Sequence, residues 1–539
     1  MQDEADLVVV NARVLTLDAE RPRAGAVALR GGLVAALGEE PGEWIGPSTR
    51  VVDARGATVL PGIIDSHNHV RLGANPGAVS LFGADSLEEI RRRLEAFVAA
   101  TPGGDWIEGE GWNYAALPEG RPHAELIDEV CAGRPAWLFS YDVHTVWLNT
   151  AALERLRVSA TSPTLPFGHA EVRDGRLTGW VHDFAVRGIH PRGQAYLEGV
   201  LPGYSLDAQY ERLATNLRDA VRYGITTIVE PQNGLRDLAL FERAAREGVL
   251  RSRLIAAVIH TPDGDGDGDA LDDIAAAVAS YQHPRVALGP VKLYIDDVVE
   301  PHTAAMLAPY ANFPGVGSTF WDPGDFAELI VALEDRGLQA FVHATGDRGI
   351  RTALDAFAEA RRRHGERDTR HQIVHVECLD PDDLPRFADL GVVACVQPRH
   401  CAPDISAEWR ENVGAERERY AWAMRSLLEA GAPVAFSSDW NVAEMDPMIG
   451  LYSALTRADL EGRGAWNLDE TVTLDQALRA YCRGGAWANF HDHDRGMLRV
   501  GYQGDLIVLS DDLEALTPSQ LLETFVTHTL VAGEVVYGD

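Results

Sequence analysis

The stretch GIIDSHNHV, from Gly62 to Val70, places two histidines directly after an apolar run. In a β-strand, residues i and i+2 point to the same side, so His67 and His69 would share one side at the end of a buried strand. Two imidazoles there make half of a metal site, because imidazole binds zinc and other transition metals. The alternative is two unrelated polar residues in a loop, and the His-x-His motif is too short to decide between the two.

The composition indicates a large soluble globular protein. The chain has 539 residues, 46% of them hydrophobic, which suffices for one large domain with additions or for several domains. It has no run of about 18 apolar residues, so we expect no membrane span. The first residues, MQDEADLVVVNARVL, lack the basic and apolar regions of a secretory signal. The five cysteines are scattered without CxxC spacing, which favours reduced thiols and a cytoplasmic protein.

The charge balance argues against two classes of partner. With 48 Lys and Arg against 81 Asp and Glu, the formal net charge is −33. Such a surface repels nucleic acid and anionic membranes, and no basic patch in the sequence offsets it. We therefore expect a small-molecule substrate, no nucleic acid and no membrane. The sequence does not determine the oligomeric state, so a homodimer stays open.

The middle of the chain alternates apolar strand candidates with longer helical stretches, which indicates parallel βα units. The eight strand candidates are ATVLPGIIDSH ending at His67, ITTIVE from Ile225, RLIAAVI from Arg253, VALGPVKLYI around Lys292, LQAFVHA around His343, HQIVHV around His375, GVVACVQP from Gly391 and PVAFSSD ending at Asp439. Eight such units fit a (β/α)8 barrel of the TIM type, an α/β fold whose catalytic groups lie at the carboxyl ends of the strands.

Both chain ends differ from the middle. In both ends, apolar and polar residues alternate over short segments, such as DLVVVNARVL at the start and HTLVAGEVVYGD at the end. This pattern predicts one small β-sandwich built from both termini. The gap between the first two barrel strands is too long for one helix, so we expect an insertion at about 78–205. The predicted organisation is 1–58 and 495–539 for the sandwich, and 59–494 for the barrel with its insertion.

The segment PDGDGDGDALDD, from Pro262, resembles a calcium-binding loop because aspartates stand at alternating positions. Such a loop carries a glutamate at its twelfth position, but the twelfth residue from Asp263 is Ile274. We therefore interpret this segment as a solvated acidic loop.

Potential metal ligands stand at or near the ends of five of the eight predicted strands. They are His67, His69, Lys292, His343, His375 and Asp439. A closed barrel brings these ends to one mouth, and core packing does not explain such a group there. A buried ammonium such as that of Lys292 costs on the order of several kcal/mol unless it is paired. An amine with a lowered pKa can instead react with carbon dioxide, and the resulting carbamate is anionic and can bridge two cations.

Longer motifs carry a family resemblance. They are PGIIDSHNHV, GWNYAALPEGRP, VKLYIDD, HATGDRGI, GVVACVQPRH, RSLLEAGAPVAFSSDW and GYQGDLIVLSDD. In their order and spacing, over nearly the whole chain, they resemble the amidohydrolase superfamily. Within it, the chain is most similar to the amidohydrolase 3 branch, which includes N-substituted formamide deformylases.

The resemblance implies a metal-dependent hydrolase that acts on a non-peptide carbon–nitrogen bond, that of an N-formyl or N-acyl amine. The implied ligands are His67, His69 and Asp439 for the more buried metal, and His343 and His375 for the second. Lys292, once carboxylated, would bridge the two metals. Zinc is the first expectation, with manganese, iron or nickel as alternatives. Metal-activated hydroxide would attack the substrate, and Asp439 would pass its proton to the leaving nitrogen.

Three positions depart from the branch pattern. Val374 stands where a glutamate usually precedes the strand histidine, and Asn441 replaces the proline after SDW. The motif VKLYIDD ends in Asp-Asp where Asp-Gly is common. None of these changes removes an implied ligand, but they weaken the transfer of any relative's substrate to this chain.

The insertion is rich in aromatic residues and is expected to cover the mouth of the barrel, as similar insertions do in the branch. The candidates for substrate contacts are Trp112, Tyr141, Trp147, Phe320 and Trp321. His144 is a candidate for a catalytic role. Because Tyr141, His144 and Trp147 are spaced three apart, the alternative is one helix face packed on the core. For Phe320 and Trp321 the alternative is a surface loop anchored by two aromatic side chains.

Two alternative functions stay open. The same hydroxide attacks any polarised acyl carbon, so the bond could be that of an ester, a lactone or a carbamate. A barrel that has lost catalysis and serves as an assembly scaffold is the alternative from another class. Superfamily relatives of that kind lack ligands, whereas all six ligand positions are filled here.

Overall fold

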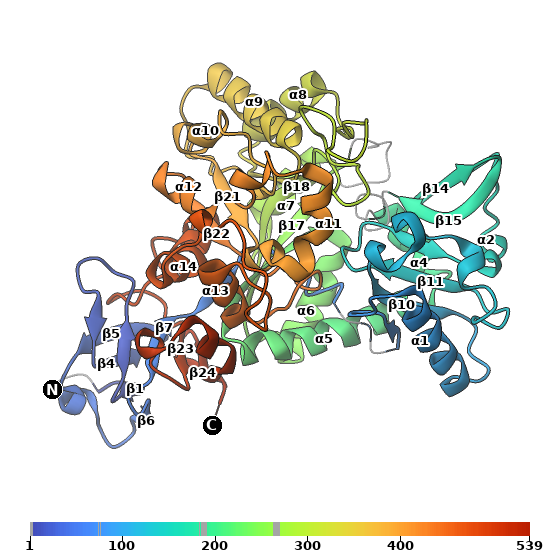
Figure 1. Cartoon of the computed structure of the whole chain (residues 1–539). Helices are drawn as coiled ribbons and strands as arrows, with labels where there is room; N and C mark the ends of the chain where they lie inside the picture. Colours follow the sequence, from blue (N-terminus) through green and yellow to red (C-terminus); the bar gives the residue numbers. More distant parts are fainter. Residues whose placement is uncertain are drawn as a thin grey trace.

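The computed structural model describes residues 4–73, 75, 77–182, 184, 191–261 and 270–538. The aspartates of the predicted acidic loop that lie within 262–269 are outside these residues. A central barrel carries the sheets of both chain ends at one side and the insertion as a separate lobe at the other (Figure 1). None of the helices in the described part of the chain combines the length and apolar character that a membrane crossing needs.

The barrel is a sheet of parallel strands wound around the centre of the molecule. Within the described residues its eight strands are β8 (Ile63–Asp65), β16 (Ile225–Asn233), β17 (Arg253–Ile259), β18 (Val286–Tyr294), β19 (Ala340–Ala344), β20 (Gln372–His375), β21 (Val393–Val396) and β22 (Val434–Phe436). Each strand pairs in parallel with the next. The amide of Ser66 donates to the carbonyl of Phe436 at 3.4 Å, which brings β8 and β22 together. The predicted α/β barrel is therefore confirmed.

The first predicted strand, 57–67, is divided between two sheets. β7 (Thr58–Pro61) pairs with strands from the chain ends, whereas β8 belongs to the barrel. Gly62 separates the two, and a Cβ at this position would lie 2.2 Å from Thr226 Oγ1 in β16. Only a residue without a side chain permits this approach, which the pattern of apolar residues does not reveal. The prediction of one continuous strand is wrong at this point.

Helices cover the outside of the barrel between its strands (Figure 1). They include α5 (Leu206–Arg222), α6 (Leu238–Arg246), α7 (Leu271–Ser280), α8 (Pro323–Asp335), α9 (Asp347–His364), α10 (Leu384–Leu390), α11 (Pro403–Val413), α12 (Met424–Glu429), α13 (Pro447–Thr456) and α14 (Leu474–Arg479). In α5, the hydroxyl of Ser205 caps the first turn by accepting from the Ala208 amide. Tyr210, Leu213 and Leu217 recur at helical spacing and are buried in the main hydrophobic core.

Strands from both chain ends form two further sheets beside the barrel. In the described residues, one has the order β5 (Leu33–Gly38), β4 (Ala26–Arg30), β1 (Leu7–Val10) and β6 (Arg50–Asp53). The other has the order β25 (Glu534–Tyr537), β24 (Val526–Val531), β23 (Leu506–Leu509), β7, β2 (Arg13–Leu15) and β3 (Arg23–Ala24). The two sheets share one apolar core, which contains Val9, Val27 and Val59 together with Leu506 and Leu530. The boundaries 58/59 and 494/495 stay predictions.

The insertion has its own sheet and two apolar cores of its own. The order of that sheet in the described residues is β13 (Thr164–Leu165), β14 (Gly168–Arg173), β15 (Arg176–His182), β12 (Val146–Leu148), β11 (Ala136–Ser140), β10 (Ile107–Trp112) and β9 (Val79–Ser80). Helices α1 (Leu87–Ala100), α2 (Thr150–Arg155) and α4 (Pro191–Glu198) accompany it. Because these two cores hold the lobe together independently of the barrel core, the lobe can hold its side chains in fixed positions at the barrel mouth.

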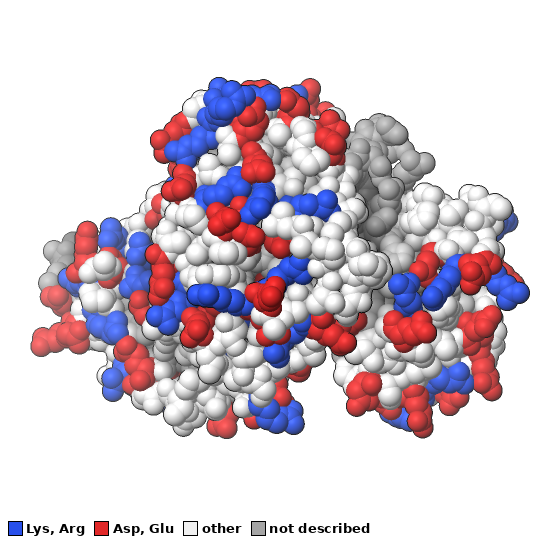
Figure 2. Space-filling view, turned by 45° about the horizontal axis from the view of Figure 1, so that its top comes forward, with Lys and Arg blue, Asp and Glu red and all other residues white. Residues whose placement is uncertain are grey.

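The face drawn in Figure 2 carries basic and acidic side chains side by side. Its blue residues are arginines, because the only lysine in the sequence is the buried Lys292. Many arginines of the described residues form short-range ion pairs, for example Arg363 with Glu359 at 2.7 Å. This face therefore offers no extended positive surface to a polyanion.

Candidate active site

The six predicted metal ligands lie at the carboxyl ends of the barrel strands. His67 and His69 follow β8, Lys292 lies in β18, His343 lies in β19, His375 ends β20, and Asp439 follows β22. All six residues are buried, with exposed fractions of 0 to 9%. Because the strands run in the same direction, their last residues meet at one mouth of the barrel.

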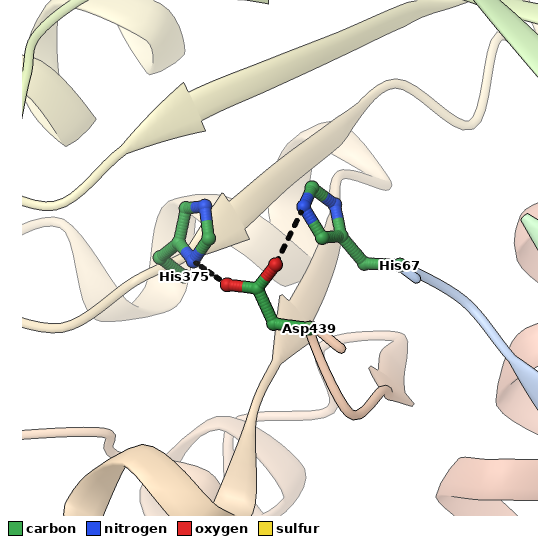
Figure 3. Close-up of side chains that lie close together, drawn as sticks. All are labelled: His67, His375 and Asp439. Atoms are coloured by element: carbon green, nitrogen blue, oxygen red, sulfur yellow. Dashed lines mark ion pairs between the residues drawn. The ribbon is translucent and has the colours of Figure 1, made fainter. Parts of the chain in front are cut away.

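Asp439 stands at the centre of this group. Its Oδ1 lies 3.2 Å from His67 Nε2 and 3.0 Å from His69 Nε2, and these two nitrogens are 3.2 Å apart. Its Oδ2 points toward His375, whose Nδ1 is 3.8 Å away (Figure 3). The ring of His343 lies next to that of His375, with the two ring centroids 4.5 Å apart. Three potential ligand atoms thus converge within 3.2 Å, and two more imidazoles stand beside them.

Lys292 is enclosed in the barrel wall next to this group. Its side chain is 0% exposed, and its Nζ lies 4.7 Å from the ring centroid of Tyr294 and 5.2 Å from that of Phe341. Among the described residues this Nζ has no hydrogen-bond partner. Burial lowers the pKa of Lys292 to about 7. The amine is therefore held where a charged ammonium is unfavourable.

Hydrogen bonds join the loops after β8 and β22 and fix the ligand positions. The carboxylate of Asp65 accepts from the Ser438 amide at 2.9 Å and from the Ser438 hydroxyl at 2.6 Å. The Asp439 amide donates to the carbonyl of His67 at 2.8 Å. Asp439 and His375 have φ angles of 57° and 80°, in the left-handed region that non-glycine residues rarely adopt. Such backbone persists only where the surroundings hold it, and it is concentrated at functional sites.

Burial keeps the imidazoles of His67, His343 and His375 neutral, and the contacts of Asp439 keep its carboxylate ionised. Burial lowers the pKa of His67 to about 3 and the pKa values of His343 and His375 well below their ordinary value. Burial alone would raise the pKa of Asp439, but its contacts with His67 and His69 outweigh this effect and hold that pKa well below its ordinary range. The group therefore offers neutral nitrogens and an anionic oxygen, which are the forms that bind a metal.

The part of the insertion that reaches the site is the turn between β11 and β12. Tyr141 and His144 lie on this turn, and both line the cavity above the ligand group. His144 Nδ1 forms an ion pair with Asp297 Oδ1, and the His144 ring centroid is 5.2 Å from that of His343. Burial opposes protonation of His144, but the charge and the hydrogen bond of Asp297 and the charges of Asp142 and Asp439 together outweigh it and raise the pKa of His144.

The structure does not bring the other four aromatic candidates to the cavity wall. Trp112 and Trp147 are 0% exposed in the core of the insertion, and their indole N–H groups donate to the carbonyls of Leu138 and His123. Phe320 packs behind Tyr294, and the Trp321 ring stacks on His260 with centroids 6.1 Å apart. The helix face suggested by the spacing of 141, 144 and 147 is wrong, because a turn holds Tyr141 and His144 and strand β12 holds Trp147.

Sequence reasoning missed several residues that line the site. His400 and Glu377 are buried there, with His400 Nε2 3.7 Å from Asp439 Oδ2 and His400 Nδ1 4.0 Å from Glu377 Oε1. Glu300 accepts from the Tyr141 hydroxyl at 3.2 Å. Position in the sequence could have revealed three of the missed polar residues. His400, Glu377 and Asp297 each follow the carboxyl end of a barrel strand by at most four residues.

The cavity enclosed by these residues is narrow. Its volume is about 50 Å³, which is enough for a few water molecules or a small reacting group. His67, His69, His343, His375 and Asp439 all line it. The candidate metal ligands, among them the Asp439 carboxylate, and the His144 imidazole therefore line one cavity.

Comparison with known proteins agrees with this geometry. A family model described as the amidohydrolase family matches residues 50–537. The chain is 28% identical to N-substituted formamide deformylase of Arthrobacter pascens, over 100% of this chain and 99% of that protein. It is also 28% identical to protein LONG AFTER FAR-RED 3 of Arabidopsis thaliana, over 97% of this chain and 91% of that protein.

A solved structure shows the same fold. The crystal structure of a metal-dependent hydrolase from Pyrococcus horikoshii superimposes with a TM-score of 0.72 and 21% sequence identity, and covers 95% of this chain and 99% of that chain. The family model extends from the terminal strand β6 through the barrel to β25. The protein belongs to the amidohydrolase family, in the amidohydrolase 3 branch that its motifs resemble.

Proposed function

We propose that this chain hydrolyses the carbon–nitrogen bond of an N-formyl or N-acyl amine with the help of bound divalent metal. The observation that carries the proposal is the buried convergence of His67 Nε2, His69 Nε2 and Asp439 Oδ1 within 3.2 Å of one another at the barrel mouth. The full-length similarity to a formamide deformylase supports the type of bond. The cavity volume of about 50 Å³ supports a formyl or another small acyl group at the reacting end.

The donor set fits a divalent transition metal. Neutral imidazole nitrogens and carboxylate oxygens are ligands of zinc, and manganese, iron and nickel accept the same types. In this proposal His67, His69 and Asp439 hold the more buried metal, and His343 and His375 hold the second. When bound, such a metal lowers the pKa of water and polarises a carbonyl oxygen.

Asp439 is the residue that moves the proton in this proposal. Its Oδ1 faces His67 and His69, whereas its Oδ2 lies 3.8 Å from His375 Nδ1 and 3.7 Å from His400 Nε2 at the cavity wall. Because the pKa of Asp439 is well below its ordinary value, the carboxylate is ionised before the reaction and can accept a proton from water. It can then deliver this proton to the leaving nitrogen.

Lys292 is proposed to carry a carbamate. The lone pair of its neutral amine attacks the carbon of carbon dioxide, an N–C bond forms, and the nitrogen releases one proton, which leaves an anionic carboxylate on the side chain. The product would replace a buried amine that has no hydrogen-bond partner among the described residues with an anion that could help to hold the metals. The composition supports a special role for this amine, because the 48 Lys and Arg comprise 47 arginines and one lysine. Charge alone does not explain a single lysine in a chain that uses arginine elsewhere.

His144 is proposed to donate a hydrogen bond to the substrate carbonyl oxygen. Asp297 holds its Nδ1, which leaves Nε2 for a ligand in the cavity. Because the pKa of His144 is raised, its ring is suited to donating toward an oxygen that gains negative charge.

A His144→Ala variant should keep its metal and lose about 10²–10³-fold in kcat, the typical cost of removing one such donor. Steady-state kinetics and elemental analysis on the same preparation measure the two effects. The matched control is His169→Ala, which removes an exposed histidine of the same lobe and should behave as wild type. A wild-type kcat for His144→Ala would contradict the assignment.

A substrate panel tests the reaction itself. The metal-loaded protein is screened with N-formyl and N-acyl amines beside esters, lactones and carbamates of similar size. We expect the N-formyl or N-acyl amines to have the highest kcat/KM. Preference for an ester, a lactone or a carbamate would replace the proposed bond type. Turnover of none of them, by protein that binds no metal, would favour a scaffold role.

A further inference from the structure

We infer that the substrate is a neutral or cationic N-acyl amine with a large apolar group, and that the site excludes compounds with a carboxylate on that group. The inference rests on the proposed function and narrows its substrate class. It is carried by the shape and the charge of a groove that adjoins the site cavity.

The groove lies between the insertion and the loops that follow β21 and β22. Its volume is about 870 Å³, against about 50 Å³ for the site cavity. The residues that line both are Tyr141, Ile405, Asn441 and Val442. A substrate whose acyl group reacts beside Asp439 therefore has room in the groove for a large remaining group. The groove volume is in the range of sites that bind small organic ligands.

Apolar side chains from two parts of the chain form much of the groove wall. The insertion contributes Ala78, Phe82 and Ala115, and the barrel loops contribute Ile405, Val442 and Ala443. Phe82 remains 39% exposed although it is a large hydrophobic residue. An aryl or alkyl group placed here would cover this apolar surface and remove its own surface from water, which favours binding.

Within the described lining of the groove, no cation is free for an anionic ligand. Arg399 is the only Lys or Arg in the described part of its lining, and it is 4% exposed. The Arg399 guanidinium is neutralised by Asp404 at 2.6 Å and by Glu444 at 2.9 Å. Asp85 and Glu110 also line the groove, so carboxylates outnumber cations there.

The site cavity, like the groove, is lined by more acidic residues than Lys and Arg among those described. No Lys or Arg lines it among the residues that the structure describes, and its acidic residues are Asp142, Glu300, Glu377 and Asp439. Burial raises the pKa of Asp142, Glu300 and Glu377, whereas Asp439 stays ionised. A third cavity of about 40 Å³ adjoins both spaces, and there Arg212 lies with two carboxylates, Glu108 and Glu110. A carboxylate on the apolar group would lose water next to these acidic side chains, with no Lys or Arg among the described residues of the site cavity and with Arg399 of the groove already paired, which is unfavourable. A neutral group carries no such cost.

Two formamides that differ only in one carboxylate test the inference. N-formyl-2-phenylethylamine and N-formylphenylalanine share the formyl group and the phenyl group, so any metal engages the same formyl oxygen in both. We expect metal-loaded protein to bind the neutral compound at least about tenfold more tightly in calorimetry, and to show a similar preference in kcat/KM. Equal binding, tighter binding of the carboxylate, or binding of neither compound would overturn the inference. If the neutral compound is preferred but not hydrolysed, the inference stands and the proposed reaction fails.

A double variant tests the cause of the preference. Asp404→Asn with Glu444→Gln removes both carboxylates from Arg399 and leaves its guanidinium free to bind an anion. We expect the preference for the neutral compound to fall by about tenfold or more, mainly because N-formylphenylalanine binds more tightly. The control is Glu534→Gln, which removes a 72% exposed carboxylate that pairs with Arg285 on the surface and should leave the preference unchanged. An unchanged preference in the double variant would show that the charge of the groove does not set the selectivity.

Discussion

An Asp439→Asn variant should fold, keep at least part of its metal, and lose about 10²–10⁴-fold in kcat, the usual contribution of a positioned general acid–base group. Asparagine preserves the shape of the side chain and one oxygen next to His67 and His69. It cannot accept a proton from water or deliver one to the leaving nitrogen. Steady-state kinetics with metal analysis of the same sample measures both effects.

Substrates with different leaving groups distinguish the two proposed roles of Asp439, proton transfer and metal binding. An activated aryl ester departs without a proton, so Asp439→Asn should lose less activity on it than on an unactivated amide. Loss of metal alone would lower the rates of both substrates alike, and excess metal would relieve it. If Asp439→Asn hydrolyses an unactivated amide at the wild-type rate, Asp439 has neither role.

A Lys292→Ala variant should lose much of its metal and most of its activity. The alanine side chain leaves space in the barrel wall, so a small carboxylate such as acetate or propionate should restore part of the turnover. Sodium chloride at the same ionic strength should not restore it. Lys292→Arg should remain inactive, because a guanidinium stays protonated and forms no carbamate. Wild-type metal content and rate in Lys292→Ala would favour a site made of the histidines and Asp439 alone.

The single lysine makes the carbamate directly observable. After exchange into ¹³C-labelled bicarbonate, the protein should show one side-chain carbamate carbon by NMR, and Lys292→Ala should lack it. Besides the chain's amino terminus, no other amine in this sequence can give such a signal, because every other cationic side chain counted in Lys+Arg is an arginine.

The barrel and the meeting of the candidate ligands at one mouth could be predicted because their signals are local in the sequence. Each strand is an apolar run, and each predicted ligand stands at or near the end of such a run, so parallel topology alone places His67, His343 and Asp439 at one mouth. The division of the first strand at Gly62 could not be predicted in this way. It depends on contact with Thr226, which is distant in the sequence.

The substrate side of the site was harder to predict because aromatic residues serve two purposes. Trp112 and Trp147 fill the core of the insertion, where a large ring buries the most apolar surface, whereas Tyr141 on the neighbouring turn reaches the cavity. Composition does not distinguish these positions. Two of the departures from the branch pattern do lie at the site: Asp297 pairs with His144, and Asn441 lines both the cavity and the groove.

The most direct test of the account is the metal content of the purified protein together with its activity before and after chelation. The account predicts one to two equivalents of transition metal per chain by elemental analysis. It also predicts that a chelator abolishes hydrolysis and that added zinc or manganese restores it. Full activity in protein freed of metal would contradict the central claim that the group of His67, His69 and Asp439 acts by holding a metal.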